Sequence, residues 1–134
     1  MTLIVCIDDA GGMTFNKRRQ SRDRIVTEDI LRTAGGRLLA APFSEKLLTG
    51  VDGVKICENP LAEAREGDYC FIELGSVRPY ADRLDGIIIY KWNRLYPSDT
   101  SLDLVPEECG FRLDEISEFV GSSHEKITKE IYKR

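Results

Sequence analysis

Short, almost wholly apolar runs are the feature of this sequence that most constrains its fold. The first run, Leu3 to Ile7, stops at Asp8, and the most β-prone run, Gly86 to Trp92, reads GIIIYKW. Unbroken apolar runs of this length are typical of strands that are buried on both faces of a parallel sheet. Three runs of the same kind lie between these two, at residues 37–41, 54–57 and 69–74. The sequence therefore predicts five buried strands.

Helical patterns separate these runs. Residues 21–34 show apolar side chains near helical spacing, with Ser21 as the expected N-cap and Gly35-Gly36 after the last turn. Shorter helices are expected at 44–48, capped by Ser44, and at 77–84. Alternation of strands and helices predicts a three-layer α/β domain. Its mostly parallel central sheet would carry helices on both faces.

Chain length and composition favour one ordinary domain. The 134 residues, 42% hydrophobic and 31% charged, contain no linker and no repeat, so we expect a single α/β domain over 1–134. No apolar run reaches the roughly 18 residues of a membrane span. The four cysteines form no Cys-x-x-Cys pair. These observations predict a cytoplasmic protein with reduced thiols, no bound metal and no membrane partner.

The end of the chain carries two conflicting patterns. Ser122 and Glu125 match a capping box, and two pairs with i,i+4 spacing support a helix, Glu125/Lys129 and Glu130/Arg134. Residues 127–133 also alternate in the manner of a strand. Local physical chemistry favours a helix over 122–134. An edge strand is expected to begin at residues 111–113.

The order of the elements resembles the dihydrofolate reductase family. The segment TLIVCIDDAGGMTFN is similar to the first strand and loop of that family, and GGRLLAAPFSEKLL to a later strand and helix. QSRDRIVTEDI is similar to the helix between them and places Asp23 where the family keeps its substrate-binding carboxylate. The resemblance implies a dihydrofolate-reductase-like fold. It also implies that ITKEIYKR is the last strand of a C-terminal antiparallel hairpin.

The same resemblance implies NADPH as cofactor, but its binding motifs are incomplete. The family uses a basic helix start after the second strand, where this chain has residues 41–44, Ala-Pro-Phe-Ser. It uses paired glycines before a later helix, where this chain has only Gly75 between Leu74 and Ser76. Glycine pairs let the backbone approach a phosphate closely. NADPH therefore stays open as a cofactor, and no cofactor is predicted firmly. We predict a ligand-binding domain, with or without reductase activity.

Candidate site residues come from the ends of the predicted strands and from the loop after the first strand. Ligands bind at the carboxyl ends of the strands in sheets of this type. Asp23 is the candidate catalytic residue, and its alternative role is that of an acid in the first turn of a helix. Asp8 and Asp9 would bind magnesium or merely end their strand. The candidate ligand-binding residues are Asp9, Arg19, Arg22, Asp23, Ser44 and Gly75.

His124 is the only histidine and stands beside Ser122 and Ser123. Because neighbours in sequence rarely have triad geometry, we expect a capping or surface histidine. The ending GSSHEKITKEIY also resembles short chains to which the name ribonuclease Z has been given. A two-zinc centre of that kind needs several histidines, which this chain lacks.

Charge leaves three classes of function open. The net charge is −4, yet five of the eight residues from Lys17 to Arg24 are basic. This cluster is either a solvated loop and helix start or an anion site, and in the second case we expect a small anionic or heteroaromatic, nucleotide-like ligand whose ring amine binds Asp23. An RNA-binding protein or nuclease that uses the same cluster is the first alternative, which the acidic balance makes less favourable. The second alternative is a protein-interaction module with a decayed active site. The sequence indicates neither an oligomeric state nor a reaction.

Overall fold

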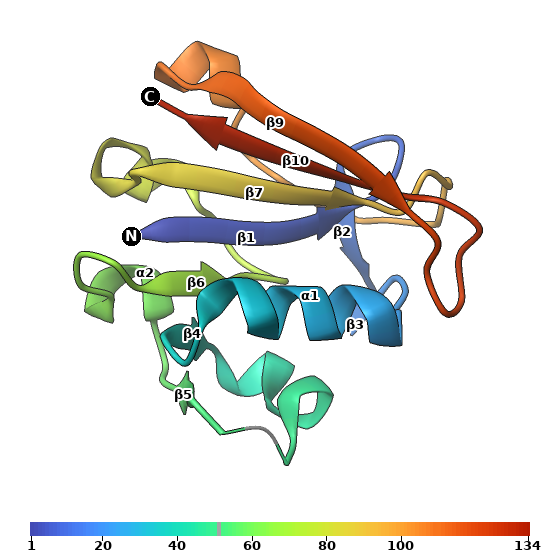
Figure 1. Cartoon of the computed structure of the whole chain (residues 1–134), viewed down its shortest axis with the longest axis horizontal. Coiled ribbons are helices and arrows are strands. Elements are labelled where there is room, and N and C mark those ends of the chain that lie inside the picture. Colours follow the sequence, from blue (N-terminus) through green and yellow to red (C-terminus); the bar gives the residue numbers. More distant parts are fainter. Residues whose placement is uncertain (51) are drawn as a thin grey trace.

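A computed structural model describes residues 1–50 and 52–134. Its main sheet has seven strands in the order β5-β4-β6-β1-β7-β10-β9 (Figure 1). Five strands are parallel: β1 Thr2–Ile7, β4 Leu38–Ala40, β5 Val54–Ile56, β6 Tyr69–Phe71 and β7 Gly86–Lys91. The last two, β10 Ile127–Lys133 and β9 Arg112–Phe119, form an antiparallel hairpin on the edge of β7. All five predicted strands, the fold class and the C-terminal hairpin are thereby confirmed.

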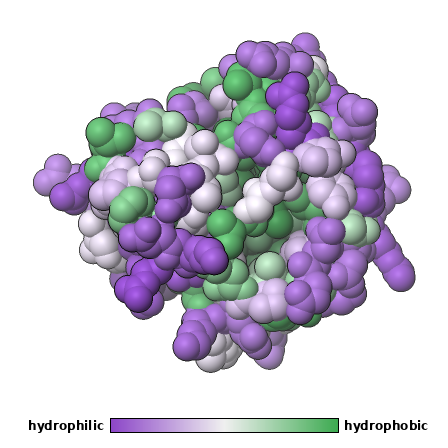
Figure 2. Space-filling model, turned by 180° about the vertical axis from the view of Figure 1, so that it is seen from behind, coloured by the Kyte–Doolittle hydropathy of each residue, from purple (hydrophilic) through white to green (hydrophobic). Residues whose placement is uncertain are grey.

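The two faces of the sheet are covered differently. Alternate side chains of β1 enter opposite apolar clusters, Leu3 and Val5 on one face and Ile4 on the other. The cluster of Ile4 packs under the helix α1 Arg24–Ala34 and the 3₁₀ helix η1 Pro42–Leu48. The other cluster contacts only short helical pieces, which are α2 Pro60–Glu63, η2 Arg78–Arg83 and η3 Pro106–Cys109. Seen from behind, apolar side chains gather in a central hollow ringed by hydrophilic ones (Figure 2).

Two expected helix starts are wrong. Asp23, and not Ser21, is the N-cap of α1, because its carboxylate accepts hydrogen bonds from the amides of Ile25 and Val26. Ser44 lies inside η1, whose first residue follows Ala41, and no side chain caps this helix. In both cases the serine hydroxyl instead contacts a residue distant in sequence, which is His124 for Ser21 and Glu73 for Ser44.

Residues 127–133 form β10, so the strand that the resemblance implied for the end of the chain is confirmed, and the helix that the local patterns favoured does not form. Ile127 is fully buried in the cluster under α1, while Tyr132 packs into the opposite cluster. Burial on both faces rewards alternation with a period of two. Pairing with β7 and β9 therefore outweighs the capping box and the local ion pairs, which stabilise a helix by only a few tenths of a kcal/mol each.

A second, small sheet was not expected from the sequence. Its order is β3-β2-β8, with β2 Gly12–Phe15, β3 Arg18–Arg19 and β8 Thr100–Ser101. Asn16 and Lys17 both have positive φ, as a two-residue hairpin turn requires. This hairpin sets Phe15 directly opposite Arg18. Across the residues that the structure describes, none of the helices has both the length and the apolar character to cross a membrane.

Candidate functional site

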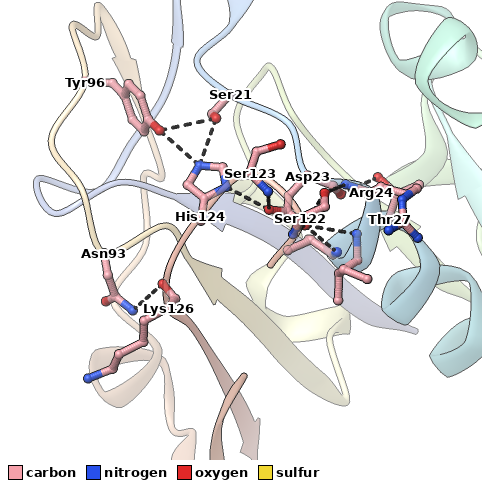
Figure 3. A network of polar contacts seen from close by, with 12 residues as sticks. Ser21, Asp23, Arg24, Thr27, Asn93, Tyr96, Ser122, Ser123, His124 and Lys126 are labelled. Atoms are coloured by element: carbon pink, nitrogen blue, oxygen red, sulfur yellow. Dashed lines mark hydrogen bonds and ion pairs between the residues drawn. The ribbon is translucent and has the colours of Figure 1, made fainter. Parts of the chain in front are cut away.

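Asp23 lies at the centre of a buried polar network (Figure 3). Besides capping α1, its carboxylate accepts hydrogen bonds from the backbone amides of Ser122, at 2.9 Å, and Ser123, at 2.8 Å. His124 Nδ1 lies 2.9 Å from Asp23 Oδ2. Burial by itself would raise the pKa of Asp23, but the hydrogen bonds from His124 and the two amides outweigh it and hold the pKa well below its ordinary value. The carboxylate is therefore ionised and fully bound by the protein.

His124 is buried, which corrects the expectation of a surface histidine. Its side chain is only 4% exposed. Its ring stacks on Trp92 with a centroid distance of 4.7 Å and an interplanar angle of 22°. Since Nδ1 faces the ionised Asp23, this nitrogen donates the hydrogen bond to the carboxylate, and Nε2 points to the other side of the network.

Two hydroxyl groups converge on the free nitrogen of His124. Ser21 Oγ and the phenolic oxygen of Tyr96 each lie 3.0 Å from Nε2. The Tyr96 hydroxyl also donates to Ser21 Oγ at 3.3 Å. Figure 3 shows Ser21 and Tyr96 on one side of the imidazole and Asp23 on the other. The arrangement joins a hydroxyl, an imidazole and a carboxylate in series, which is the geometry of nucleophile, base and orienting acid.

A second network adjoins the first. Arg19 forms a two-contact ion pair with Glu73, in which the Nη2–Oε1 distance is 2.6 Å. Ser44 Oγ donates to the same Oε1 atom at 2.6 Å. The pairing with Glu73 raises the pKa of Arg19. A cavity of only about 10 Å³ separates the two networks, and its lining includes Ser21, Arg19, Glu73 and Cys6. The carboxyl ends of the central strands are thus closed by the chain's own side chains.

Three larger clefts open beside the networks, and two of them lie near Tyr96 and His124. One has a volume of about 470 Å³, and its walls come from the small sheet and the loop after β7: Phe15, Asn16, Arg18, Arg19, Gln20, Tyr96 and Pro97. The other, of about 610 Å³, is bounded by the loops at residues 92–94 and 123–126 and exposes one edge of His124. The buried network therefore has solvent on two sides.

The remaining predicted residues lie apart from these networks. Asp9 is exposed, and only its backbone amide is bound, by the carbonyl oxygen of Arg94. Arg22 is exposed beside the start of α1. Gly75 lies in the loop after β6 with a φ of 104°. The structure thus brings Arg19 and Ser44 together through Glu73, and it places Asp23 in the adjacent network.

Asp8 is committed to the turn after β1, while Asp9 is exposed. Asp8 is buried and accepts hydrogen bonds from the amides of Ala10, Gly12 and Tyr96. These bonds hold the turn after β1, and they lower the pKa of Asp8 against the opposing effect of burial. Within residues 1–50 and 52–134, no three metal-ligating side chains of the His, Cys, Asp and Glu types gather at one place.

Sequence reasoning missed three members of the site. Glu73 carried a signal, since an acid at the end of the apolar run YCFIEL is unusual in a buried strand. Ser21 matched only a helix cap, and Tyr96 stood out only as an aromatic side chain near Arg94, suited to stacking on a flat ring or to packing at a strand end. Their role depends on contacts with His124 that span 103 and 28 residues of sequence.

The residues present do not fit the dinucleotide that the resemblance implies. The amides of Val77 and Arg78, which begin η2 after the single glycine, both donate to Asp103 Oδ1. Ser76 Oγ donates to the other carboxylate oxygen of Asp103. Near η1, the carboxylate of Glu73 takes the hydroxyl of Ser44. Internal carboxylates therefore occupy the donors that a pyrophosphate would need.

Comparison with known proteins supports the fold alone. No family model matches the chain, and no similar sequence was found among curated proteins. The structure is similar to that of a dihydrofolate reductase from Enterococcus faecalis, solved in complex with NADP(H) and RAB-propyl. The TM-score is 0.72 at 12% sequence identity, over 99% of this chain and 95% of the reductase. The chain has a dihydrofolate-reductase-like fold.

Proposed function

We propose that the protein binds a small, flat, anionic ligand of the nucleoside monophosphate type in the 470 Å³ cleft beside the β2–β3 hairpin. The observation that carries the proposal is Arg18, an exposed cation set directly across the hairpin from Phe15, an aromatic ring that is 41% exposed. A cation beside an exposed ring is suited to a ligand that joins an anion to an aromatic system.

Charge in the cleft supports an anionic ligand. Its described walls include Arg18 and Arg19 and no acidic side chain. Arg19 is neutralised by Glu73. Within the described residues, neither Arg18 nor its neighbour Lys17 takes part in an ion pair. An anion that enters the cleft therefore meets uncompensated positive charge without displacing an internal partner.

The opposite walls support a flat heteroaromatic group. Tyr96 lines the cleft, and the guanidinium of Arg94 lies 5.6 Å from the centre of its ring. Gln20 also lines the cleft, and its Oε1 atom is buried without a hydrogen-bond partner in the described structure. A buried acceptor without a partner costs about 1–3 kcal/mol. An N–H donor on the ligand's ring would satisfy it.

The phosphate backbone of RNA is the second candidate for the same surface. Lys17, Arg18 and Arg22 are exposed on the segment that leads into α1. The other two basic residues of the cluster are engaged, Arg19 by Glu73 and Arg24 by Glu28. Three free cations suit one phosphate group better than the many contacts of a polynucleotide, whose binding would fall steeply with salt.

Binding is tested by thermal unfolding with adenosine, guanosine, cytidine and uridine monophosphates, with inorganic phosphate and with a ten-nucleotide RNA. At 100 times its dissociation constant, a ligand adds about 2.7 kcal/mol of stability, a shift of several degrees for a domain of this size. We expect a shift with at least one nucleotide that phosphate alone does not produce.

Two matched variants assign the effect to the cleft. In Arg18→Ala the affinity for the nucleotide should fall roughly ten- to a hundredfold, because a hydrogen bond to a charged group is lost. Arg112→Ala, at an exposed arginine of the edge strand β9, should bind as the wild type does. Equal affinities in the two variants, or a response to RNA alone with a steep salt dependence, would refute the proposal.

A further inference from the structure

We infer that Ser21, His124 and Asp23 form a nucleophilic triad that hydrolyses a small carboxylic ester. Ser21 Oγ lies 3.0 Å from His124 Nε2, and His124 Nδ1 lies 2.9 Å from Asp23 Oδ2. Both distances are within hydrogen-bonding range of a serine, a general base and the group that orients the base. The three residues come from the start of α1 and from the turn before β10, so the geometry exists only in the folded chain.

The protonation state of the network suits this role. Asp23 holds the proton of the imidazole on Nδ1, which leaves the lone pair of Nε2 to accept the proton of Ser21. Asp23 itself is kept ionised by the amides of Ser122 and Ser123. A charged carboxylate in this position stabilises the imidazolium that forms when His124 takes the serine proton.

The imidazole is held in one orientation. Trp92 stacks on one side of the ring, and Tyr96 packs edge-on with a centroid distance of 6.4 Å. Preorganisation of this kind is required of a general base, since a displacement of about 1 Å costs on the order of a hundredfold in rate.

Ser21 lies beside the ligand cleft and lines the adjoining cavity of about 10 Å³. It is half-buried and lies between two residues that line the cleft, Gln20 in sequence and Tyr96 in space. The phenolic hydroxyl of Tyr96, 3.3 Å from Ser21 Oγ, is placed to donate a hydrogen bond to the oxyanion that forms on the carbonyl carbon. The substrate class is an ester that bears an anionic group. The anionic part of this class rests on the proposed function, whereas the nucleophile does not.

The reaction balances without a cofactor. Ser21 Oγ forms a bond to the carbonyl carbon while its proton passes to His124 Nε2. The alkoxide leaving group departs with that proton, and an acyl-serine remains. Water then adds to the acyl group, its proton passes to Nε2, and the carboxylic acid leaves as Ser21 recovers its proton.

The test is covalent labelling of the full chain with diisopropyl fluorophosphate, in which Ser21 Oγ replaces fluoride on phosphorus. We expect one adduct per chain, mapped to Ser21 by peptide mass spectrometry. The adduct should be absent in Ser21→Ala and form on the order of 10³-fold more slowly in His124→Gln. Ser117→Ala, at an exposed serine of β9, is the matched control and should label at the wild-type rate. Hydrolysis of p-nitrophenyl acetate should follow the same order.

Asp23 is a positioning residue, and its test needs a readout other than stability. In Asp23→Asn, which keeps a side chain able to cap α1, the midpoint of the pH profile of labelling should move, because no carboxylate stabilises the imidazolium. An unmoved profile would show that Asp23 acts only in folding. No adduct, an adduct on Tyr96 or spread over several serines, or wild-type labelling of His124→Gln would overturn the triad.

The labelling experiment also separates this inference from the proposed function. Diisopropyl fluorophosphate carries no charge, so its reaction with Ser21 tests the nucleophile apart from the anionic part of the ligand. Labelling of Ser21 without any nucleotide-dependent shift would sustain the triad and refute the ligand proposal. Nucleotide binding without labelling of Ser21 would sustain the ligand proposal and refute the triad.

Discussion

His124 Nδ1 lies 2.9 Å from Asp23 Oδ2, although 101 residues separate the two in sequence. This contact ties the N-terminus of α1 to the turn that leads into β10. The same carboxylate accepts the amides of Ser122 and Ser123, so a single side chain holds both elements. Because the C-terminal hairpin lies on the edge of the parallel sheet, Asp23 links the two parts of the fold as well as the members of the site.

The stability of the protein should fall at low pH partly because of Asp23. Its pKa in the folded state is lowered below the value of about 3.9 in an unfolded chain, so its stabilising effect is complete above that value and is lost as the pH falls toward the folded pKa. Asp23→Asn should show a shallower loss of unfolding free energy below about pH 4. Urea unfolding at pH 6, 4, 3 and 2 measures both slopes, and equal slopes would contradict the assignment.

Gly121→Ala should destabilise the protein by about 1–3 kcal/mol, as overpacking does. A Cβ atom at Gly121 would clash with Asp23 Oδ2, so the carboxylate or the turn has to move. Chemical denaturation of Gly121→Ala, Asp23→Ala and the double variant forms a thermodynamic cycle. The cost of Gly121→Ala should be much smaller when Asp23 is already absent. Simple additivity would mean that the clash is not with Asp23.

Tyr90→Phe should lower the free energy of unfolding by roughly 1.5–3 kcal/mol, since it removes a hydrogen bond to a charged group. The Tyr90 hydroxyl donates to Asp29 Oδ2 at 2.6 Å, and burial together with this bond raises the pKa of the phenol. Lys129 from β10 reaches the same oxygen at 2.7 Å. Tyr80→Phe, at a half-buried tyrosine whose hydroxyl accepts an exposed hydrogen bond from Asn59, serves as the control and should change the free energy of unfolding by less than about 0.5 kcal/mol.

The similarity to a dihydrofolate reductase over nearly the whole chain concerns architecture, because the sequence identity is 12%. In this chain the carboxylate of Asp103 accepts hydrogen bonds from the amides that begin η2, and Glu73 forms an ion pair with Arg19. A fold can keep its strand order while its ligand chemistry changes, since strand order depends on apolar patterning and the site depends on a few polar side chains.

The apolar runs by themselves determined the five parallel strands. An apolar run such as GIIIYKW buries all its side chains only in a strand whose two faces are both covered. Local composition therefore decides that it lies inside the sheet. The first helix followed in the same way from its apolar spacing. Asp23 and the basic segment from Lys17 to Arg24 were likewise visible as candidates before any contact was known.

Only the tertiary structure decided what residues 122–134 become and which residues surround His124. Pairing with β7 and burial of Ile127 and Tyr132 on opposite faces stabilise a strand here by more than the capping box and the i,i+4 pairs stabilise a helix. The contacts of Ser21 and Tyr96 with His124 join segments that no local pattern relates. The physical reason is that apolar periodicity depends on residues close together in the sequence. A polar network depends on distances between residues far apart in the sequence, and these distances are set only when the sheet forms.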